Sequence, residues 1–364
     1  LVGITTMTSP YYFVPPSGST AERPQSPPPG MLRFNTDIGR LEVWRNDHWA
    51  TILGESPNLG DNNNTNSTGG TGTRGVIMGG GTPSPVNEMD YITVDTLGNS
   101  QDFGDLTSTE RGSSNGQAGS RVRGLAMGGN DTGYNVESIT FASTGSAVNH
   151  GNLFTVNRRL GAGVSNQTRA LYCGGLGGSP STSRNNIDLV TISSLAEAED
   201  FGDISTASYF VSAVSSSVRG VISVGRESTF PGNIDYVTIS TTGNGQDFGD
   251  LNEGQIPDGA GNSIRGIFSG GSNPTFTNFI DFVTIASTGD AQDFGDLTVA
   301  KTMAAAVSSP TRYVTMGGQV SPTTKIDEMD YVTIATTGNA ASFGELTGSD
   351  RFRATGASNG HGGL

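Results

Sequence analysis

Residues 278–298 decide the fold of this chain, and they read NFIDFVTIASTGDAQDFGDLT. An apolar run with one acidic residue comes first, and a short turn leads to a second run around Phe294. Counting variants, this pattern occurs six times. The first runs begin at Met89, Val136, Ile187, Ile234, Ile280 and Met329, and the second runs span 101–106, 148–153, 199–204, 246–251, 292–297 and 341–346. Such repetition indicates a chain built from copies of one structural unit.

An arginine precedes each copy and opens an apolar run that two glycines usually close. These arginines lie 46 to 50 residues apart, at Arg74, Arg123, Arg169, Arg219, Arg265 and Arg312. Each unit is expected to hold four short strands, A to D, exemplified by residues 302–308, 312–316, 330–334 and 293–297. Four strands in this length match one blade of a β-propeller, and a kelch blade runs to about 50 residues. The sequence therefore predicts an all-β fold.

The ends of the repeat region predict a closed ring of six blades. The first unit begins with strand B at Arg74, whereas residues 351–360, after the last unit, resemble the A strands of the others. We therefore expect this C-terminal strand to pair with Arg74–Met78, which leaves no exposed sheet edge at the seam. The arrangement is similar to a kelch-type six-bladed β-propeller, a resemblance carried by the four-strand period and by the Gly-Gly after strand B. It departs from kelch repeats because the late Trp of each blade is missing.

Residues that repeat with the blade are predicted to be structural. The six arginines are expected to make an ion pair or a turn bond at the blade end where strand D begins, with a ligand site as the alternative. Strand C repeats an aspartate at Asp90, Asp188, Asp235, Asp281 and Asp330. Strand D repeats a phenylalanine that we expect to pack between blades, at Phe103, Phe201, Phe248, Phe294 and Phe343. The second unit has His150 instead, as a decayed copy or a specialised contact.

Residues 1–53 form a separate module, and residues 54–73, rich in Gly, Asn, Ser and Thr, form a flexible linker to residues 74–364. Apolar residues alternate at Leu32/Phe34 and Leu41/Val43, which predicts short strands that continue to Trp49, with turns at 36–39 and 46–47. A module this short cannot bury a core of its own. It is therefore predicted to oligomerise through contacts of Tyr11, Tyr12, Phe13, Phe34, Trp44 and Trp49.

The runs TAERP at 20–24, GMLRFNTD at 30–37 and LEVW at 41–44, together with Trp49, resemble a small module common in bacteriophage tail fibres and other virion appendages. The match covers a small part of the chain, at several separated positions. This resemblance implies a homotrimer at the particle surface that binds other virion proteins through the module.

Composition narrows the remaining functions. The 364 residues carry a net charge of −14, which argues against nucleic acid or an anionic membrane as a partner. A single cysteine, Cys173, excludes an intramolecular disulfide and a cysteine-based zinc site. No apolar run is long enough to cross a bilayer. We expect no cofactor and no metal.

Three functions remain, and the sequence favours the first. A non-enzymatic virion appendage would present the propeller as a structural knob or for adhesion to a host surface glycan or protein. A propeller glycosidase or another carbohydrate-active enzyme would need a pair of acids confined to one or two blades, whereas these acids repeat with the blade. Three histidines and one cysteine argue against a copper site like that of galactose oxidase. A cellular kelch-like scaffold would leave the N-terminal module unexplained.

Overall fold

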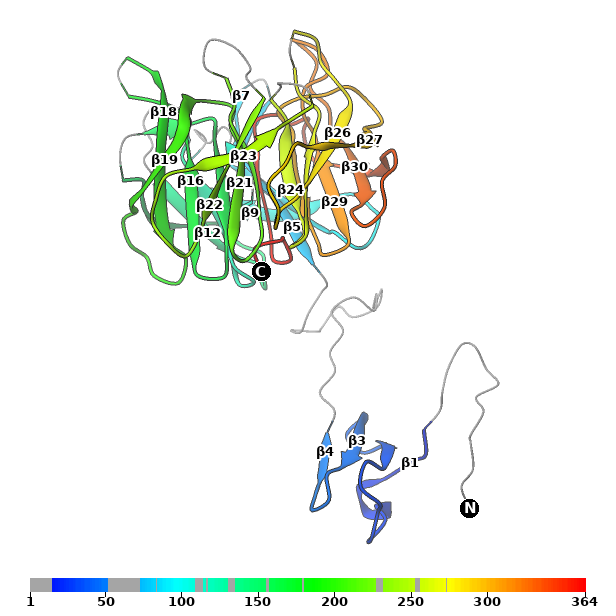
Figure 1. Cartoon of the computed structure of the whole chain (residues 1–364). Helices are drawn as coiled ribbons and strands as arrows, with labels where there is room; N and C mark the ends of the chain where they lie inside the picture. Colours follow the sequence, from blue (N-terminus) through cyan, green and yellow to red (C-terminus); the bar gives the residue numbers. More distant parts are fainter. Residues whose placement is uncertain are drawn as a thin grey trace. The chain divides into compact units, whose positions relative to one another are not determined.

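The computed structural model describes residues 15–51, 73–82, 84–108, 114–115, 117–129, 135–154, 157–178, 180–226, 232–252, 256–272 and 274–364. The chain divides into two compact units, Leu1–Ser56 and Pro57–Leu364 (Figure 1). This division falls within the predicted linker, of which residues 54–72 lie outside the described ones. The regular structure is β-strand, with one short 3-10 turn, Thr20–Glu22. No helix among the described residues is long and apolar enough to span a membrane.

The first unit is a small sheet in the order β1-β2-β3-β4. Its strands are β1 (Ser17–Gly18), β2 (Leu32–Asn35), β3 (Arg40–Trp44) and β4 (Trp49–Thr51). The three strands that alternation predicted are confirmed. Asn46 turns the chain between β3 and β4 with a left-handed φ of 82°, a conformation that asparagine tolerates better than most residues.

The core of this small sheet is polar rather than apolar. Glu42 is fully buried and receives Arg23, whose Nη2 lies 2.5 Å from Oε2, and Arg33, whose Nη1 lies 3.5 Å from Oε1. Asn35 is also buried and donates to Glu42. In this unit Phe34, Trp44 and Trp49 are only partly buried, and Ile38 is exposed. The described part of the unit therefore keeps an apolar surface that its own fold does not cover.

The second unit contains six sheets, which we number along the chain, and the small hairpin β6 (Gly81–Thr82) and β7 (Ser84–Pro85). Sheet 1 is β32 (Thr355–Ser358), β5 (Arg74–Met78), β8 (Glu88–Thr93) and β9 (Gln101–Asp105). Sheet 2 is β11 (Arg123–Met127), β12 (Asn135–Thr140) and β13 (Val148–Asn152). Sheet 3 is β15 (Gly161–Ser165), β16 (Arg169–Cys173), β18 (Thr182–Thr191) and β19 (Glu199–Ser208), with the short β10 (Ser114–Asn115), β14 (Arg158–Arg159) and β17 (Leu176–Gly177).

Sheets 4 to 6 repeat one arrangement of four antiparallel strands. Sheet 4 is β20 (Ser212–Ser215), β21 (Arg219–Ser223), β22 (Asn233–Thr238) and β23 (Gln246–Asp250). Sheet 5 is β24 (Asp258–Gly261), β25 (Arg265–Ser269), β26 (Phe279–Thr284) and β27 (Gln292–Asp296). Sheet 6 is β28 (Ala305–Ser308), β29 (Arg312–Met316), β30 (Glu328–Thr333) and β31 (Ala341–Glu345).

Sheet 1 joins the two ends of the repeat region. The C-terminal strand β32 pairs antiparallel with β5, Thr355 opposite Met78 and Ser358 opposite Gly75. This is the pairing expected from the sequence. Sheets 2 and 3 differ from the expected pattern. Residues 117–120 meet β11 only at the bridge between Gly119 and Gly124, and β10 pairs with β15 of sheet 3 instead. In sheet 3, β18 and β19 are ten residues long.

Backbone hydrogen bonds join each sheet to the next. The N–H of Gly289, in the turn after β26, donates to the carbonyl of Phe248 in β23 at 2.7 Å. Equivalent bonds join Gly145 to Phe103, Gly243 to Phe201 and Gly338 to Phe294, and the N–H of Gly98 makes the same bond to Phe343, from sheet 1 to sheet 6. Between sheets 2 and 3 the N–H of Ala198 donates to the carbonyl of Asn152 instead. The first strands of the sheets contact one another at a common centre in the order β15, β20, β24, β28, β32. Glycines permit this close approach: a Cβ on Gly259 would lie 2.6 Å from Oγ of Ser212.

The six-sheet unit has two dissimilar ends. One, the loop face, carries the connections between the second and third strands, such as residues 317–327, and those leaving each last strand. The other, the turn face, carries tight turns such as residues 262–264, together with Thr73 and the C-terminal residues. Figure 1 shows the longer loops at the end away from the C-terminus.

Candidate functional site

Six arginines tie the sheets together at the turn face. Nη1 of Arg265 donates to the carbonyls of Ile334 and Ala335, which follow β30 of the next sheet, at 2.9 and 3.1 Å. The other five cross the equivalent joints: Arg74 to Phe141, Arg123 to Ile192, Arg169 to Ile239 and Ser240, Arg219 to Ile285 and Ala286, and Arg312 to Val94. We call these bonds the arginine clasps. The clasp of Arg312 joins sheet 6 to sheet 1.

Four of these guanidinium groups also lie over an aromatic ring of their own sheet. Arg265 lies 4.7 Å from the ring centroid of Phe282, and Arg74, Arg219 and Arg312 cover Tyr91, Tyr236 and Tyr331. Of the two expected contacts, the geometry shows the turn bond rather than the ion pair, because the side-chain hydrogen bonds described for all six arginines go to backbone carbonyls of the following sheet. Those carbonyls lie just past the end of a strand, where the ladder no longer supplies a donor.

Acidic side chains tie the same joints together at the loop face. Each lies in a third strand and binds a residue in or after the last strand of the preceding sheet. Asp281 accepts from Nδ2 of Asn252 at 2.7 Å, and Asp235 accepts from the N–H of Ser205 at 2.7 Å. The other pairs are Asp188 with Phe154, Asp330 with Thr298, Asp90 with Arg351 and Glu137 with Thr107. We call these contacts the acid clasps. In sheet 2 the acid is Glu137, which the pattern of a repeated aspartate does not identify.

Three acid clasps contain a buried cation that sequence reasoning missed. Nη2 of Arg158 lies 2.6 Å from Asp188, Nζ of Lys301 lies 3.2 Å from Asp330, and Arg351 binds Asp90. All three cations are almost fully buried. Burial raises the pKa of Asp90 to about 6, although Arg351 opposes this. Arg158 and Lys301 each stand 11 residues before the arginine that opens the second strand of their sheet, and Arg351 begins the matching C-terminal run. The signal is weak because other repeats carry Ser208 and Gly254 at this position.

The five repeated phenylalanines pack between neighbouring sheets. Phe248 lies among residues of sheets 4 and 5, and Phe343 among residues of sheets 6 and 1. Phe103, Phe201 and Phe294 occupy the equivalent clusters. A β-bulge at each acid clasp places the phenylalanine there, as between Ile234 and Asp235.

The glycine after each phenylalanine explains the repeated Asp-Phe-Gly. Gly249 has a φ of 146°, and a Cβ there would lie 2.5 Å from the backbone of Gly289 in the next sheet. No other residue fits both the conformation and the space. In sheet 2 the phenylalanine is replaced by His150, which is buried, with Nε2 3.1 Å from the carbonyl of Thr191. Burial lowers the pKa of His150.

The module residues predicted to make oligomer contacts fall in two groups. Phe34, Trp44 and Trp49 are partly buried, and the two tryptophan rings lie 5.6 Å apart. Tyr11, Tyr12 and Phe13 lie outside the described residues.

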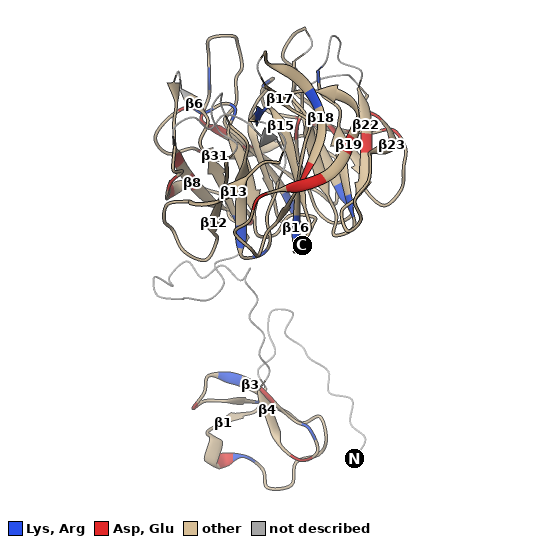
Figure 2. Cartoon of the chain, turned by 90° about the vertical axis from the view of Figure 1, so that its left-hand side faces the viewer, with Lys and Arg blue, Asp and Glu red and all other residues tan. Residues whose placement is uncertain are grey.

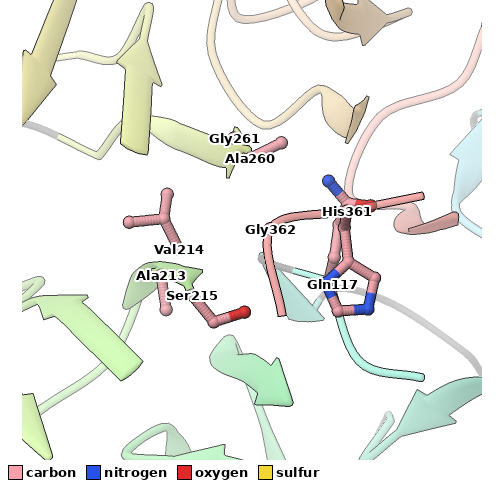
Figure 3. Close-up of a pocket in the computed structure, with 8 residues that line it drawn as sticks. All are labelled: Gln117, Ala213, Val214, Ser215, Ala260, Gly261, His361 and Gly362. Carbon is pink, nitrogen blue, oxygen red and sulfur yellow. The ribbon is translucent and has the colours of Figure 1, made fainter. Parts of the chain in front are cut away.

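C-terminal residues fill the centre of the sheets at the turn face. His361 is buried, with Nε2 3.2 Å from the carbonyl of Gly119, and its Nδ1 accepts from the N–H of Gly363 at 3.1 Å. The N–H of Gly362 donates to Gly261 of β24. Figure 3 shows His361 and Gly362 beside β20 and β24, around a cavity of about 10 Å³. This space holds a water molecule at most.

The loop face has a different centre, built on strained backbone. Four residues other than glycine have left-handed φ angles of 56° to 61° at equivalent points just before a first strand: Leu160, Phe210, Met303 and Arg353. Such angles cost free energy in residues other than glycine, and they persist where surrounding structure enforces them, often at functional sites. Leu160, Phe210 and Ile256 form a small apolar cluster, against which Tyr209 and Met303 pack.

Cations and aromatic rings alternate at this centre. Nζ of Lys325 lies 5.1 Å from the ring of Phe352, and the guanidinium of Arg353 lies 5.4 Å from the same ring and 5.8 Å from Phe210. Phe210 belongs to the connection into sheet 4 and Arg353 to the connection into sheet 1, so this stack spans the centre. Figure 2 shows Lys and Arg among the loops at the end away from the C-terminus.

No known protein family matches this sequence, and no curated protein does. Among the described residues, no three His, Cys, Asp or Glu side chains gather closely enough to hold a metal ion. The loop-face centre is the candidate functional site that the described geometry supports best, because it combines partly exposed charge, aromatic surface and backbone strain.

Proposed function

We propose that the second unit is a kelch-like six-bladed β-propeller in which each sheet is a blade and β32 closes the ring. Three observations support this architecture. The backbone bonds between sheets continue from sheet 6 to sheet 1. The arginine and acid clasps recur at all six joints. The first strands meet at a common centre that small residues and the C-terminal residues fill.

We further propose that the chain is a non-enzymatic virion appendage of a bacteriophage, at the particle surface, whose propeller head faces outward. One observation carries this orientation: Thr73, the last residue of the linker, lies at the turn face, where the N–H of Val94 donates to its carbonyl at 2.8 Å. Because the chain reaches the head at the turn face, the loop face is its free end. The head then contacts a host surface glycan or protein, or serves as a knob.

The N-terminal module is proposed to attach the appendage to other virion proteins as a homotrimer. Its partly buried Phe34, Trp44 and Trp49 support association, because a polar cluster around Glu42 occupies its interior. Burying apolar surface between copies stabilises an oligomer in proportion to the area removed from water.

The absence of catalysis is part of the proposal. The acids of the repeated blade positions are engaged in clasps between blades, each with a partner from the neighbouring sheet. A hydrolase would need two carboxyl groups facing a shared substrate cleft. No described feature favours the carbohydrate-active alternative.

Particle imaging tests the proposed location. Gold-labelled antibodies raised against residues 73–364 should decorate intact particles at projecting appendages, and an unrelated antibody should not. Recovery of the protein only from the soluble fraction of the cells, with undecorated particles, would overturn the proposal.

The mass of the full-length chain in solution tests the oligomer. Sedimentation should give a trimer for the full chain, and a double variant with Trp44→Ser and Trp49→Ser should dissociate with an unchanged propeller melting transition. A monomeric wild-type chain would refute the trimer without affecting the particle result.

A further inference from the structure

The inference concerns Arg353, at the centre of the loop face. Its φ of 57° is left-handed, and its N–H donates to the carbonyl of Met303 at 2.8 Å, which fixes the backbone. The side chain lies between the rings of Phe352 and Phe210, and Nε approaches Sδ of Met303 at 3.3 Å. A strained backbone and two flanking rings thus hold one guanidinium in place.

The charge of Arg353 lacks a carboxylate partner among the described residues. In the same connection Arg351 is already paired with Asp90, so the acid clasp does not explain the second arginine. Partial burial lowers the pKa of Arg353, and the nearby charge of Arg159 lowers it further. Lys325 adds a second positive charge over the ring of Phe352. In a chain of net charge −14, this is a local concentration of positive charge.

We propose that the centre of the loop face binds the carboxylate of an acidic saccharide, with Arg353 as the principal partner. A guanidinium matches a carboxylate with two parallel N–H donors. Lys325 supplies a second charge without fixed geometry. The partly exposed ring of Tyr209 offers an apolar face against which the C–H face of a sugar ring packs.

Backbone pairing favours a sugar over an acidic peptide. An extended peptide gains affinity by adding to an open strand edge. Around this centre the backbone is already paired: Val211 donates to Leu160, Gly271 to Lys301 and Gly318 to Arg351. A sugar needs no strand edge. The choice of a saccharide also rests on the proposed role in host-surface attachment.

The experiment measures binding of the full-length chain to a defined oligosaccharide by titration calorimetry. The probe is a tetramer of glucuronic acid, and the control probe is the same tetramer with its carboxyls reduced to alcohols. The wild type should bind the acidic tetramer, more weakly as salt rises, and should not bind the reduced one. Equal binding of both tetramers, or of neither, overturns the proposal.

Two substitutions locate the site. Arg353→Gly removes the guanidinium and suits the left-handed backbone, so it should fold at least as well as the wild type and weaken binding about tenfold or more. Arg353→Gln tests the charge alone. Arg121→Gln, at an exposed arginine of the turn face, is the matched control and should bind as the wild type does. Unchanged binding by both Arg353 variants would refute the assignment.

A third probe separates the alternatives. Hexaglutamate should bind more weakly than the uronate tetramer; tighter binding would replace the saccharide with an acidic peptide. Because these measurements use the isolated chain, they are independent of the particle imaging. The chain can fail to bind the acidic tetramer even if the antibodies show that it lies on the particle. The chain can also bind the acidic tetramer even if the imaging shows that it is not part of the virion.

Discussion

Acidification should loosen the C-terminal residues through His361. The ring is buried at the turn face, and its Nδ1 accepts a hydrogen bond from Gly363. Because that nitrogen accepts, Nε2 carries the proton and donates to the carbonyl of Gly119. A second proton would break the bond from Gly363 and bury a charge. Burial accordingly lowers the pKa of His361 from 6.5 to about 4.

The sign and size of the effect follow from this shift. Between pH 6.5 and 4 the unfolded chain binds a proton at His361 and the folded chain does not. The stabilisation is therefore fully present above pH 6.5 and is lost as the pH falls to 4. One pH unit corresponds to about 1.4 kcal/mol, so the full loss is on the order of 3 kcal/mol.

Denaturant unfolding of the full chain and of His361→Gln, between pH 4 and 8, measures this contribution. Glutamine keeps a donor but does not titrate, and His150 titrates in both proteins and cancels in the difference. The wild type should lose about 3 kcal/mol relative to the variant from pH 6.5 to 4, and nothing from 7 to 8. Parallel curves for the two proteins would refute the reasoning.

Three further predictions concern the joints between sheets. Arg265→Gln should lower the free energy of unfolding by about 1–3 kcal/mol because it removes one arginine clasp. Arg121→Gln, the control, should change the free energy of unfolding little. An equal change in both variants would contradict a stabilising role for the clasp. Gly249→Ala should lower the melting temperature more than Gly243→Ala does. Both glycines have φ near 150°, but only at Gly249 would an added Cβ meet backbone within 3 Å. An equal fall in melting temperature for both variants would show that backbone strain alone is the cause. Deleting residues 351–364 should cause aggregation or a large fall in melting temperature because β5 loses β32 and Asp90 loses Arg351. A truncated chain that melts like the full one would show that β32 is dispensable.

The strands were predictable because each unit repeats the same apolar pattern. The period of the arginines placed β29 at residues 312–316 and the C-terminal strand opposite β5. The partners of those arginines could not be read from the sequence. These partners are backbone carbonyls of another sheet. Every residue has a backbone carbonyl, so no residue type in the sequence marks them.

The candidate site was missed for a related reason. The position of Arg353 recurs before other first strands, but the other copies carry Leu160, Phe210 and Met303 there, so no repeated residue type marks it. Its importance comes from Phe210, 143 positions earlier in the sequence, whose ring lies 5.8 Å from the guanidinium of Arg353. Its left-handed backbone has no sequence signature, since such angles normally mark glycine or asparagine. The homotrimer and the phage origin stay predictions.

The clasps leave one class of segment unused. The arginine clasps lie at the turn face, and the acid clasps bind residues in or after each last strand, so the described residues of the loops between second and third strands contribute no clasp donor. Apart from the glycines that pair with the next connection, such as Gly271 and Gly318, those loops can therefore change in length and composition with little effect on the joints. A scaffold of this kind can diversify its outer surface by mutation or exchange of six independent segments while its frame stays constant.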